Sequence, residues 1–211
     1  MKKKDIAAFA VNELKKLYPE AVCSLDYKTP FQLLIATRLS AQCTDARVNM
    51  VTPALFSKFP THTEMANAEI KDIEEIIKSC GLYKTKAVSL KEIAIGIRDR
   101  FGGEVPDTIE ELTTLSGVGR KTANLICGDI YNKPAIVTDT HFIRIMGRLA
   151  LTKSTNPLIV EKEMKKLLDP KESNDFCHRI VHFGRDICSA RNPKCEECPL
   201  KEVCVKKGVK K

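Results

Sequence analysis

The sequence has no long apolar run and no low-complexity tract. No stretch approaches the ~20 apolar residues that span a bilayer. The short apolar run from Ile6 lacks the length and the cleavage site of a signal peptide. The hydrophobic fraction of 43% is ordinary for a globular chain and argues against disorder. We therefore expect a soluble protein of the cell interior that has no membrane partner.

Alternating strand patterns, interdomain linkers and internal repeats are missing as well. Apolar residues instead recur at helical spacing almost throughout, and glycine or proline ends several of the runs. The sequence predicts an all-α fold, and any division into lobes must be compact. The predicted helices cover residues 6–17, 31–39, 70–77, 88–97, 108–115, 122–131, 141–150, 157–168 and 173–187.

The nine cysteines argue for a metal centre and against a disulfide framework, since their number is odd and no secretion signal is present. Four of them lie within 17 positions at intervals of six, two and five residues: Cys188, Cys195, Cys198 and Cys204. Four thiolates suit either zinc or an iron–sulfur cluster, and the spacing alone leaves both open. The other five are scattered, as small buried hydrophobic residues often are.

The net charge of +8 suits a polyanionic partner such as nucleic acid, although a solvated lysine-rich surface would give the same balance. The most informative segment is residues 115–124, in which Gly117, Val118 and Gly119 separate two helical stretches. Glycines there allow positive φ and close backbone approach, and the amides of Val118 to Lys121 would present an anion site at a helix N-terminus. An ordinary corner between two helices is the alternative, but Arg120 and Lys121 favour phosphate binding.

Lys121 is the candidate nucleophile. It falls in the first turn of the second helix, where the helix dipole opposes a cation and so favours the neutral, nucleophilic amine. A lysine that only pairs with phosphate remains the alternative. Asp139 precedes the next predicted helix, and either it or Thr140 suits the N-cap. Asp139 could otherwise stabilise a developing sugar cation or help to move protons.

The remaining polar candidates give weaker signals. Arg191 and Lys194 lie between the first two clustered cysteines and could contact phosphates. His178 and His182 are four residues apart, but no glutamate completes a zinc-protease motif, so we expect them in the core or an interface. We expect His62 in a loop.

Several of these segments together resemble the endonuclease III family of helix-hairpin-helix DNA glycosylases, over nearly the whole chain. The segments are residues 39–45, 81–87, 103–106, 115–124 and 139–141, together with the four-cysteine spacing.

The resemblance implies a fold of two helical lobes with the active cleft between them. A six-helix lobe at 22–132 would carry the helix-hairpin-helix, and a second helical lobe, 1–21 with 133–211, would hold a [4Fe–4S] cluster on the four cysteines. Lys121 matches the catalytic nucleophile and Asp139 the catalytic carboxylate. Gln42 and Leu82 match residues inserted into the duplex where the damaged base has left.

The implied function is that of a bifunctional DNA glycosylase and AP lyase of base excision repair. Its substrate would be double-stranded DNA that contains oxidised pyrimidines or abasic sites. The expected protein is a monomer in the bacterial or archaeal cytoplasm, at the nucleoid when bound to DNA. Further DNA contacts are expected at residues 117–120 (Gly117, Val118, Gly119 and Arg120) and at His141, Arg191 and Lys194.

Three departures from the family pattern accompany the resemblance. Ser116 replaces a usual proline, Thr138 replaces a usual aliphatic residue, and Cys43 replaces a threonine or alanine. None of them removes a reacting group, although loss of the proline could loosen the hairpin.

Three alternatives stay open. A monofunctional adenine glycosylase would share the fold, but Lys121 and the end of the sequence at Lys211 count against it. A non-catalytic DNA-binding module would bind DNA without base release. A zinc-stabilised interaction protein would contain no iron.

Overall fold

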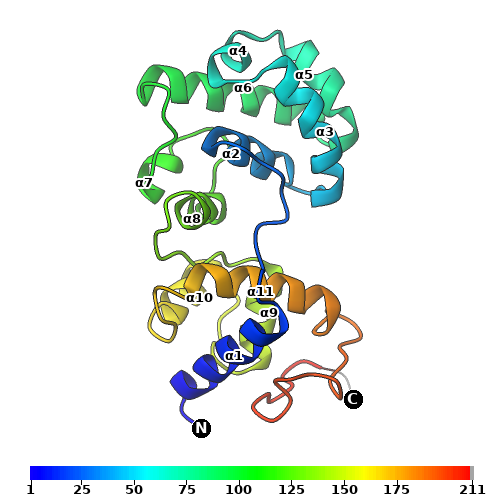
Figure 1. Ribbon diagram of the computed structural model, residues 1–211, viewed down its shortest axis with the longest axis vertical. Coiled ribbons are helices and arrows are strands. Elements are labelled where there is room, and N and C mark those ends of the chain that lie inside the picture. Colours follow the sequence, from blue (N-terminus) through cyan, green and yellow to red (C-terminus); the bar gives the residue numbers. More distant parts are fainter. Residues whose placement is uncertain (210–211) are drawn as a thin grey trace. The chain divides into compact units, whose positions relative to one another are not determined.

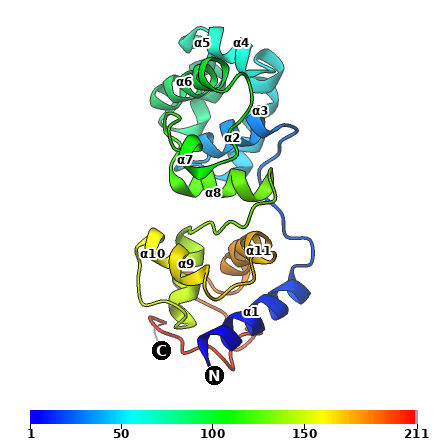
Figure 2. The ribbon, with the colours of Figure 1, turned by 90° about the vertical axis from the view of Figure 1, so that its left-hand side faces the viewer.

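The computed structural model describes residues 1–209; Lys210 and Lys211, which end the second predicted lobe, lie outside the described residues. Every regular element in the described part is helical, which confirms the all-α prediction. The chain divides into two compact units (Figures 1 and 2). The central unit is Cys23–Tyr131, and the terminal unit combines Met1–Val22 with Asn132–Lys211. Within the described residues, no helix is long and apolar enough to cross a membrane.

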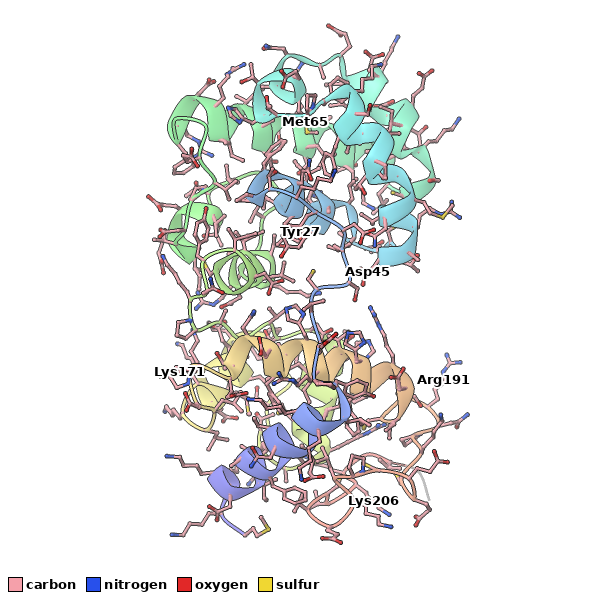
Figure 3. The ribbon with its side chains drawn as sticks, viewed as in Figure 1. Tyr27, Asp45, Met65, Lys171, Arg191 and Lys206 are labelled. Atoms are coloured by element: carbon pink, nitrogen blue, oxygen red, sulfur yellow. The ribbon has the colours of Figure 1, made fainter. Side chains whose placement is uncertain are left out.

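The central unit is built around one hydrophobic core. Its buried members run from Leu25 to Cys127, and α4 and α5 pack along α6 (Figure 1). Met65 lies in this interior (Figure 3) and is fully buried. The helices are α2 (Pro30–Leu39), α3 (Asp45–Lys58), α4 (His62–Asn67), α5 (Ile70–Ile77), α6 (Tyr83–Arg100), α7 (Ile109–Leu112) and α8 (Arg120–Asp129), and a 3-10 turn, η1 (Lys78–Cys80), follows α5.

Helix α2 forms the centre of this core. Its first turn is fixed by Thr29, whose hydroxyl accepts from the Gln32 amide, and by Pro30 at the first helical position. Six of its ten residues are buried, so the helix is covered on most sides. This placement explains why its sequence is nearly continuous in apolar residues instead of amphipathic.

Two helices, α3 and α4, fall where no helix was predicted. Helix α3 buries Val48, Val51, Thr52 and Leu55 at helical spacing, in spite of a proline in its interior. Helix α4 begins at His62, so the prediction that His62 lies in a loop is wrong. Its start is fixed by a capping box of Thr61 and Glu64, and the His62 ring packs edge-on to Phe31.

The boundaries of most other helices differ from the prediction by a few residues, and α6 and α7 are two examples. Helix α6 starts at Tyr83, five residues before the predicted start at 88, and α7 covers only Ile109–Leu112 of the predicted 108–115. The Thr108 hydroxyl caps α7 by accepting from the Glu111 amide. These are boundary shifts within elements that the periodicity identified correctly.

The terminal unit joins the two ends of the chain. Helix α1 (Lys3–Leu17) packs on α11 (Ser173–Asp186), which also packs on α9 (Thr140–Arg148). Between them in sequence lies α10 (Pro157–Met164), and residues 187–209 follow α11 without a further helix.

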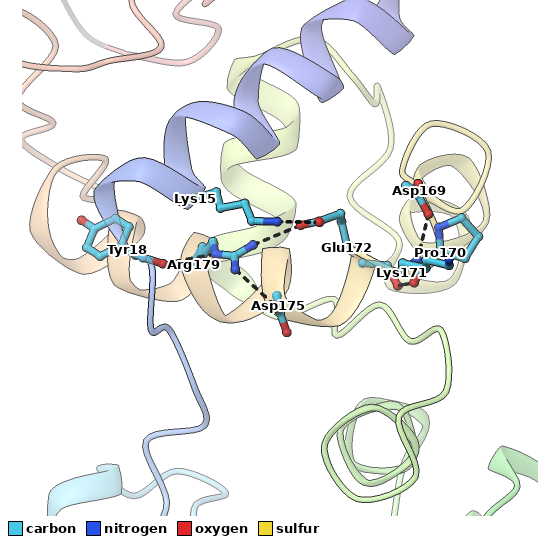
Figure 4. Close-up of polar contacts among 9 residues, drawn as sticks. Lys15, Tyr18, Asp169, Pro170, Lys171, Glu172, Asp175 and Arg179 are labelled. Carbon is cyan, nitrogen blue, oxygen red and sulfur yellow. Dashed lines mark hydrogen bonds and ion pairs between the residues drawn. The ribbon is translucent and has the colours of Figure 1, made fainter.

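Arg179 of α11 anchors the end of α1 (Figure 4). This guanidinium is only 3% exposed. It donates to the Tyr18 carbonyl at 3.2 Å and reaches Glu172 at 3.4 Å and Asp175 at 3.1 Å. Lys15 of α1 meets the other Glu172 oxygen at 2.7 Å. Because the guanidinium is buried and fully engaged, this network fixes how α1 joins the terminal unit.

Candidate active site

The predicted hairpin is present between α7 and α8. The Leu115 amide donates to the Leu112 carbonyl, and the Val118 amide donates to the Leu115 carbonyl, both at 3.1 Å. The side chains of Leu115 and Val118 are buried, which anchors the turn in the core. The Val118 amide is therefore used within the turn, and the expectation that it would bind phosphate is corrected.

The two glycines of the hairpin meet different surroundings. Gly117 has φ +66°, and a Cβ there would lie 2.5 Å from Arg38 Nε and 2.7 Å from Ser89 Oγ. The Arg38 guanidinium donates to Ser89 Oγ, which in turn donates to the Ser116 carbonyl. Gly119 has φ −91°, and a Cβ there would meet nothing within 4 Å. The fold thus requires glycine at 117, whereas glycine at 119 leaves open space in front of α8.

Lys121 lies in the first turn of α8, as the sequence predicted. Gly119 is the N-cap of this helix and provides no side chain to its first amides. Such amides carry the positive end of the helix dipole and attract anions. The side chains of Arg120 and Lys121 are both exposed. The hairpin therefore presents backbone donors, a guanidinium and an amine at one point of the central unit.

Gln42 and Leu82 share an unusual backbone conformation. Their φ angles are +55° and +47°, in the left-handed region that costs a non-glycine residue about 1–2 kcal/mol. Both side chains are exposed, and Leu82 is 59% accessible. Gln42 follows α2 and Leu82 is the N-cap of α6, so each sits in a short turn at the end of a helix. Backbone strain and an exposed apolar side chain are typical of residues kept for a binding role.

Lys86 ties these two turns together, and sequence reasoning missed it. Its ammonium donates to the carbonyls of Leu39 and Cys80, each at 2.8 Å. The residue is only 1% exposed, and burial lowers its pKa, against the opposing influence of nearby Cys43 and Cys80. The Lys86 ammonium thus satisfies the Leu39 carbonyl at the end of α2 and the Cys80 carbonyl at the end of η1. The Gln42 turn follows α2, and the Leu82 turn follows η1.

Ser116 and Thr138 each have a local role. The Ser116 hydroxyl donates to Glu92 of α6 at 2.5 Å, which links the hairpin to that helix. Proline could not form this bond. A proline would restrict the backbone at this position, whereas Ser116 holds the hairpin to α6 through a side-chain hydrogen bond. Thr138 is buried, as expected of the aliphatic residue that it replaces.

Asp139 is the N-cap of α9. Its Oδ1 accepts from the Phe142 amide at 2.7 Å, and the residue is partly exposed. The capping role that the sequence suggested is therefore present. The cap uses Oδ1 of the Asp139 carboxylate, and Oδ2 has no hydrogen bond in the described part of the chain.

His141 connects the Asp139 cap to α11. Its Nδ1 lies 3.1 Å from Nη2 of Arg144, and since arginine can only donate, His141 accepts there as a neutral ring. Burial lowers the pKa of His141, while the Asp139 carboxylate opposes that shift. The same guanidinium group donates to the carbonyls of Gly184 and Cys188. A Cβ at Gly184 would lie 2.4 Å from His141 Nδ1, so this glycine permits the close packing.

The four clustered cysteines line one cavity after α11, together with Arg148 and Lys194. No three His, Cys, Asp or Glu side chains within residues 1–209 converge closely enough to hold a single metal ion. Four thiols around one cavity supply the ligand set that an iron–sulfur cluster or a zinc ion takes.

Arg148 of α9 organises the first cysteine loop. Its guanidinium donates to Cys188 Sγ at 3.1 Å and to the Ser189 and Ala190 carbonyls at 2.7 and 3.0 Å. Such donors stabilise thiolate charge and orient the ligand. Arg191 is exposed and points outward from this loop (Figure 3).

Lys194, the other basic residue of the loop, is exposed as well. Its amide donates to the Ile187 carbonyl at 2.9 Å, which folds the loop back on the end of α11. The two histidines of α11 are partly buried, and the His182 ring stacks on Tyr18 with centroids 5.7 Å apart.

Comparisons with known proteins agree with this arrangement. Residues 35–170 match the model of the HhH-GPD superfamily of base excision DNA repair proteins. Residues 188–204 match the iron–sulfur binding domain of endonuclease III. These matches define the class as a helix-hairpin-helix repair protein with an iron–sulfur segment, and they indicate a [4Fe–4S] cluster as its cofactor.

Comparison with individual relatives identifies the family within this class. Endonuclease III of Synechocystis sp. is 48% identical over 192 residues, which cover 90% of this chain and 88% of that protein. A solved non-covalent endonuclease III–DNA complex is 40% identical, with a TM-score of 0.92 and 98% and 96% of the two chains covered. A trapped endonuclease III–DNA covalent intermediate matches with the same identity and TM-score, over 98% and 97%. The chain belongs to the endonuclease III family.

Proposed function

We propose that this chain is a DNA glycosylase and AP lyase of base excision repair that acts on oxidised pyrimidines in double-stranded DNA. The observation that carries the proposal is Lys121, an exposed amine in the first turn of the hairpin's second helix. The family supports it, because solved relatives include a DNA complex and a trapped covalent intermediate. We expect a monomer that works at the nucleoid.

Docking on DNA would begin with the phosphates. The uncapped amides at the start of α8 and the Arg120 guanidinium are sequence-independent donors. Gly119 lets a phosphate approach these amides, because no side chain fills the space in front of them. Arg191 and Lys194 add charge from the cysteine segment.

The damaged nucleotide would then leave the stack, which costs a few kcal/mol and least for a poorly stacked base. Gln42 and Leu82 suit the gap that remains. One is a polar side chain that can pair with the opposite base, and the other is an exposed apolar side chain that can replace lost stacking. Lys86 would support both, since it holds the turns on which they stand.

The neutral Lys121 amine would attack the sugar C1′ and displace the base, which takes up a proton as it leaves. Opening of the sugar ring gives a Schiff base between Lys121 and C1′. Loss of a proton from C2′ then breaks the bond to the 3′ oxygen and cleaves the strand by β-elimination. This sequence links base removal to strand cleavage through one residue.

Asp139 would serve the same reaction as a carboxylate. Its Oδ1 is held by the cap of α9, so the group is fixed in orientation while Oδ2 has no hydrogen bond in the described residues. A fixed negative charge stabilises positive charge that develops on the sugar, and a free oxygen can accept a proton. The structural and catalytic roles of Asp139 are therefore compatible.

The [4Fe–4S] cluster supplies four metal–thiolate bonds that hold residues 188–204 together when it is bound. Arg148 would neutralise part of the charge on the thiolates, because it already donates to Cys188 Sγ. The reaction proposed for Lys121 involves no change of oxidation state. The protein residues around the cysteines thus shape a DNA-contacting loop.

Borohydride trapping on a duplex that contains an oxidised pyrimidine tests the proposal. Wild-type protein should form a covalent complex with DNA, and Lys121→Gln should not. Lys71→Gln is the matched control, because Lys71 is an exposed lysine of the same unit and its loss changes the net charge equally. Full trapping by Lys121→Gln would overturn the assignment, and base release without trapping would indicate a monofunctional glycosylase.

The role of Asp139 needs a separate pair of variants. Asp139→Asn keeps a side-chain oxygen that can cap α9, whereas Asp139→Ala removes both cap and charge. We expect both to lose base release and only Asp139→Ala to lose stability, by about 1 kcal/mol. Wild-type activity in Asp139→Asn would restrict Asp139 to its capping role.

A further inference from the structure

A groove runs along α6 in the central unit, beside the hairpin. It has a volume of about 460 Å³ and is lined by residues of α2, α5, α6 and the hairpin turn. Lys84 of its lining comes only two residues after Leu82, so the groove begins next to the Leu82 turn. The lining includes four charged side chains, Arg38, Glu74, Lys84 and Glu92, together with Ser89 and Gly117.

Arg38 of α2 is held by one hydrogen bond and keeps two nitrogens free. Its Nε donates to Ser89 Oγ at 2.9 Å. Ser89 is only 4% exposed and donates in turn to the Ser116 carbonyl at 3.0 Å. Within residues 1–209, Nη1 and Nη2 of Arg38 donate to no acceptor. A guanidinium fixed at Nε presents these two nitrogens in a set direction, so a ligand that accepts from them costs little further side-chain entropy.

Two further donors line the same groove. The Gly117 amide donates to no acceptor in the described part of the chain, and Gly117 is exposed. The Arg38 guanidinium lies directly against it, since a Cβ on Gly117 would be 2.5 Å from Nε and 3.1 Å from Cζ. Lys84 is exposed and pairs with no carboxylate of residues 1–209. A guanidinium, a backbone amide and an ammonium are the donors that commonly bind phosphate oxygens.

We propose that this groove binds a second DNA phosphate, next along the strand to the phosphate at the start of α8. The proposal rests on the proposed DNA-repair function and adds a contact to it. Gly117 of the groove and Gly119 of the α8 site belong to one turn, so the two sites can hold neighbouring phosphates of one strand. Arg38 and Lys84 thereby fix the strand beside the turn whose Leu82 enters the duplex.

The two carboxylates limit what the groove can hold. Glu92 accepts a hydrogen bond from Ser116, whereas Glu74 of α5 has no partner within residues 1–209. Their charges balance those of Arg38 and Lys84, so a free anion gains little net attraction. A phosphate of a docked strand is brought to the groove by the rest of the duplex, at high effective concentration. The groove therefore suits a phosphodiester of bound DNA, and Glu74 weakens its binding.

The first test places a single neutral methylphosphonate at successive positions around a stable abasic-site analogue in duplex DNA. At the groove position it should weaken wild-type binding several-fold, but have little effect on binding by Arg38→Gln or Lys84→Gln. Arg120→Gln should instead lose its sensitivity at a neighbouring position. The groove site is overturned if both groove variants keep the wild-type sensitivity at every position. Loss of sensitivity in Arg38→Gln only at the Arg120 position would mean that Arg38 merely supports the hairpin.

The second test uses the opposite signs of the lining charges. Lys84→Gln should lower the slope of log affinity against log salt by about 1, while Lys71→Gln, on an exposed lysine outside the groove, should not. Glu74→Gln should tighten DNA binding several-fold, and more than Glu75→Gln on the same helix, because Glu75 does not line the groove. Equal effects of the two glutamate variants would contradict a phosphate in the groove.

Two further measurements separate this site from folding and from the chemistry. Urea denaturation reports any loss of stability in Arg38→Gln, whereas Lys84→Gln removes an exposed side chain without a hydrogen bond in the described residues. Normal borohydride trapping by wild type without any response to the groove variants overturns the groove alone. The groove responses without borohydride trapping would instead overturn the proposed function, so the two failures are distinguishable.

Discussion

The two hairpin glycines should respond in opposite ways to the same substitution. In Gly117→Ala, the added Cβ would lie 2.5 Å from Arg38 Nε and 2.7 Å from Ser89 Oγ, on a backbone with φ +66°. In Gly119→Ala, it would meet nothing within 4 Å, on a backbone that any residue can adopt. The first change should therefore damage the fold, and the second should damage a ligand site.

The magnitude for Gly117→Ala follows from three contributions. A left-handed alanine costs about 1–2 kcal/mol. Displacement of the Arg38–Ser89 hydrogen bond costs about 0.5–1.5 kcal/mol. The loss of unfolded-chain freedom returns about 0.4–1 kcal/mol, so the free energy of unfolding should fall by about 2 kcal/mol.

Gly119→Ala should change the free energy of unfolding by no more than about 0.5 kcal/mol. Alanine is a poorer N-cap than glycine, but it also reduces the conformational freedom of the unfolded chain, and the two effects oppose each other. Its methyl group would instead stand where a phosphate meets the first amides of α8. A loss of about 1.4 kcal/mol in binding corresponds to tenfold weaker affinity for duplex DNA.

Urea denaturation of both variants measures the first quantity, and a binding titration at fixed salt measures the second. The reasoning is refuted if Gly119→Ala is as unstable as Gly117→Ala, or if Gly119→Ala binds DNA like wild type. If the free energy of unfolding of Gly117→Ala equals that of wild type, the Arg38 and Ser89 side chains can move away from the added Cβ without loss of stability.

Three other predictions concern polar side chains that are wholly or partly buried. Lys86→Met leaves two buried carbonyls, those of Leu39 and Cys80, without their charged donor and should lower the free energy of unfolding by about 2–4 kcal/mol in urea titrations. Because the folded pKa of His141 is lowered, the unfolded chain binds more protons below pH ~6.5; stability should fall as pH decreases there, with a smaller slope in His141→Gln. Arg148→Met removes the donor to Cys188 Sγ and should lower the iron content after dialysis; full retention of four irons would contradict this role.

Much of the fold could be predicted because burial follows helical spacing. The missed helix α3 carries the same signal in Val48, Val51, Thr52 and Leu55, but it also contains Pro53, a residue type that helix interiors disfavour. Helix α4 has only six residues and is specified mainly by its capping box. Short helices of this kind depend on tertiary packing, here of His62 against Phe31, which local sequence does not reveal.

The residues of the candidate site also differ in how well the sequence predicted them. Lys121 stood out because glycines mark a turn and fix the start of the next helix. Lys86 did not, because lysine is seldom fully buried. Yet it lies four, seven and eleven residues before Leu90, Ile93 and Ile97, on the buried face of α6. Its position was readable from the periodicity, whereas its two carbonyl partners come from turns that only the folded chain brings together.

The division of the chain also bears on synthesis at the ribosome. Helix α1 is the first helix of this sequence to be made, and its partner α11 is the last. At 5–20 residues per second, roughly 10–30 s separate the two, and the continuous central unit can fold within that interval. Through that time Ala7, Ala10, Val11 and Leu14 have no α11 to cover them. The apolar face of α1 thus stays uncovered until the last helix has been made.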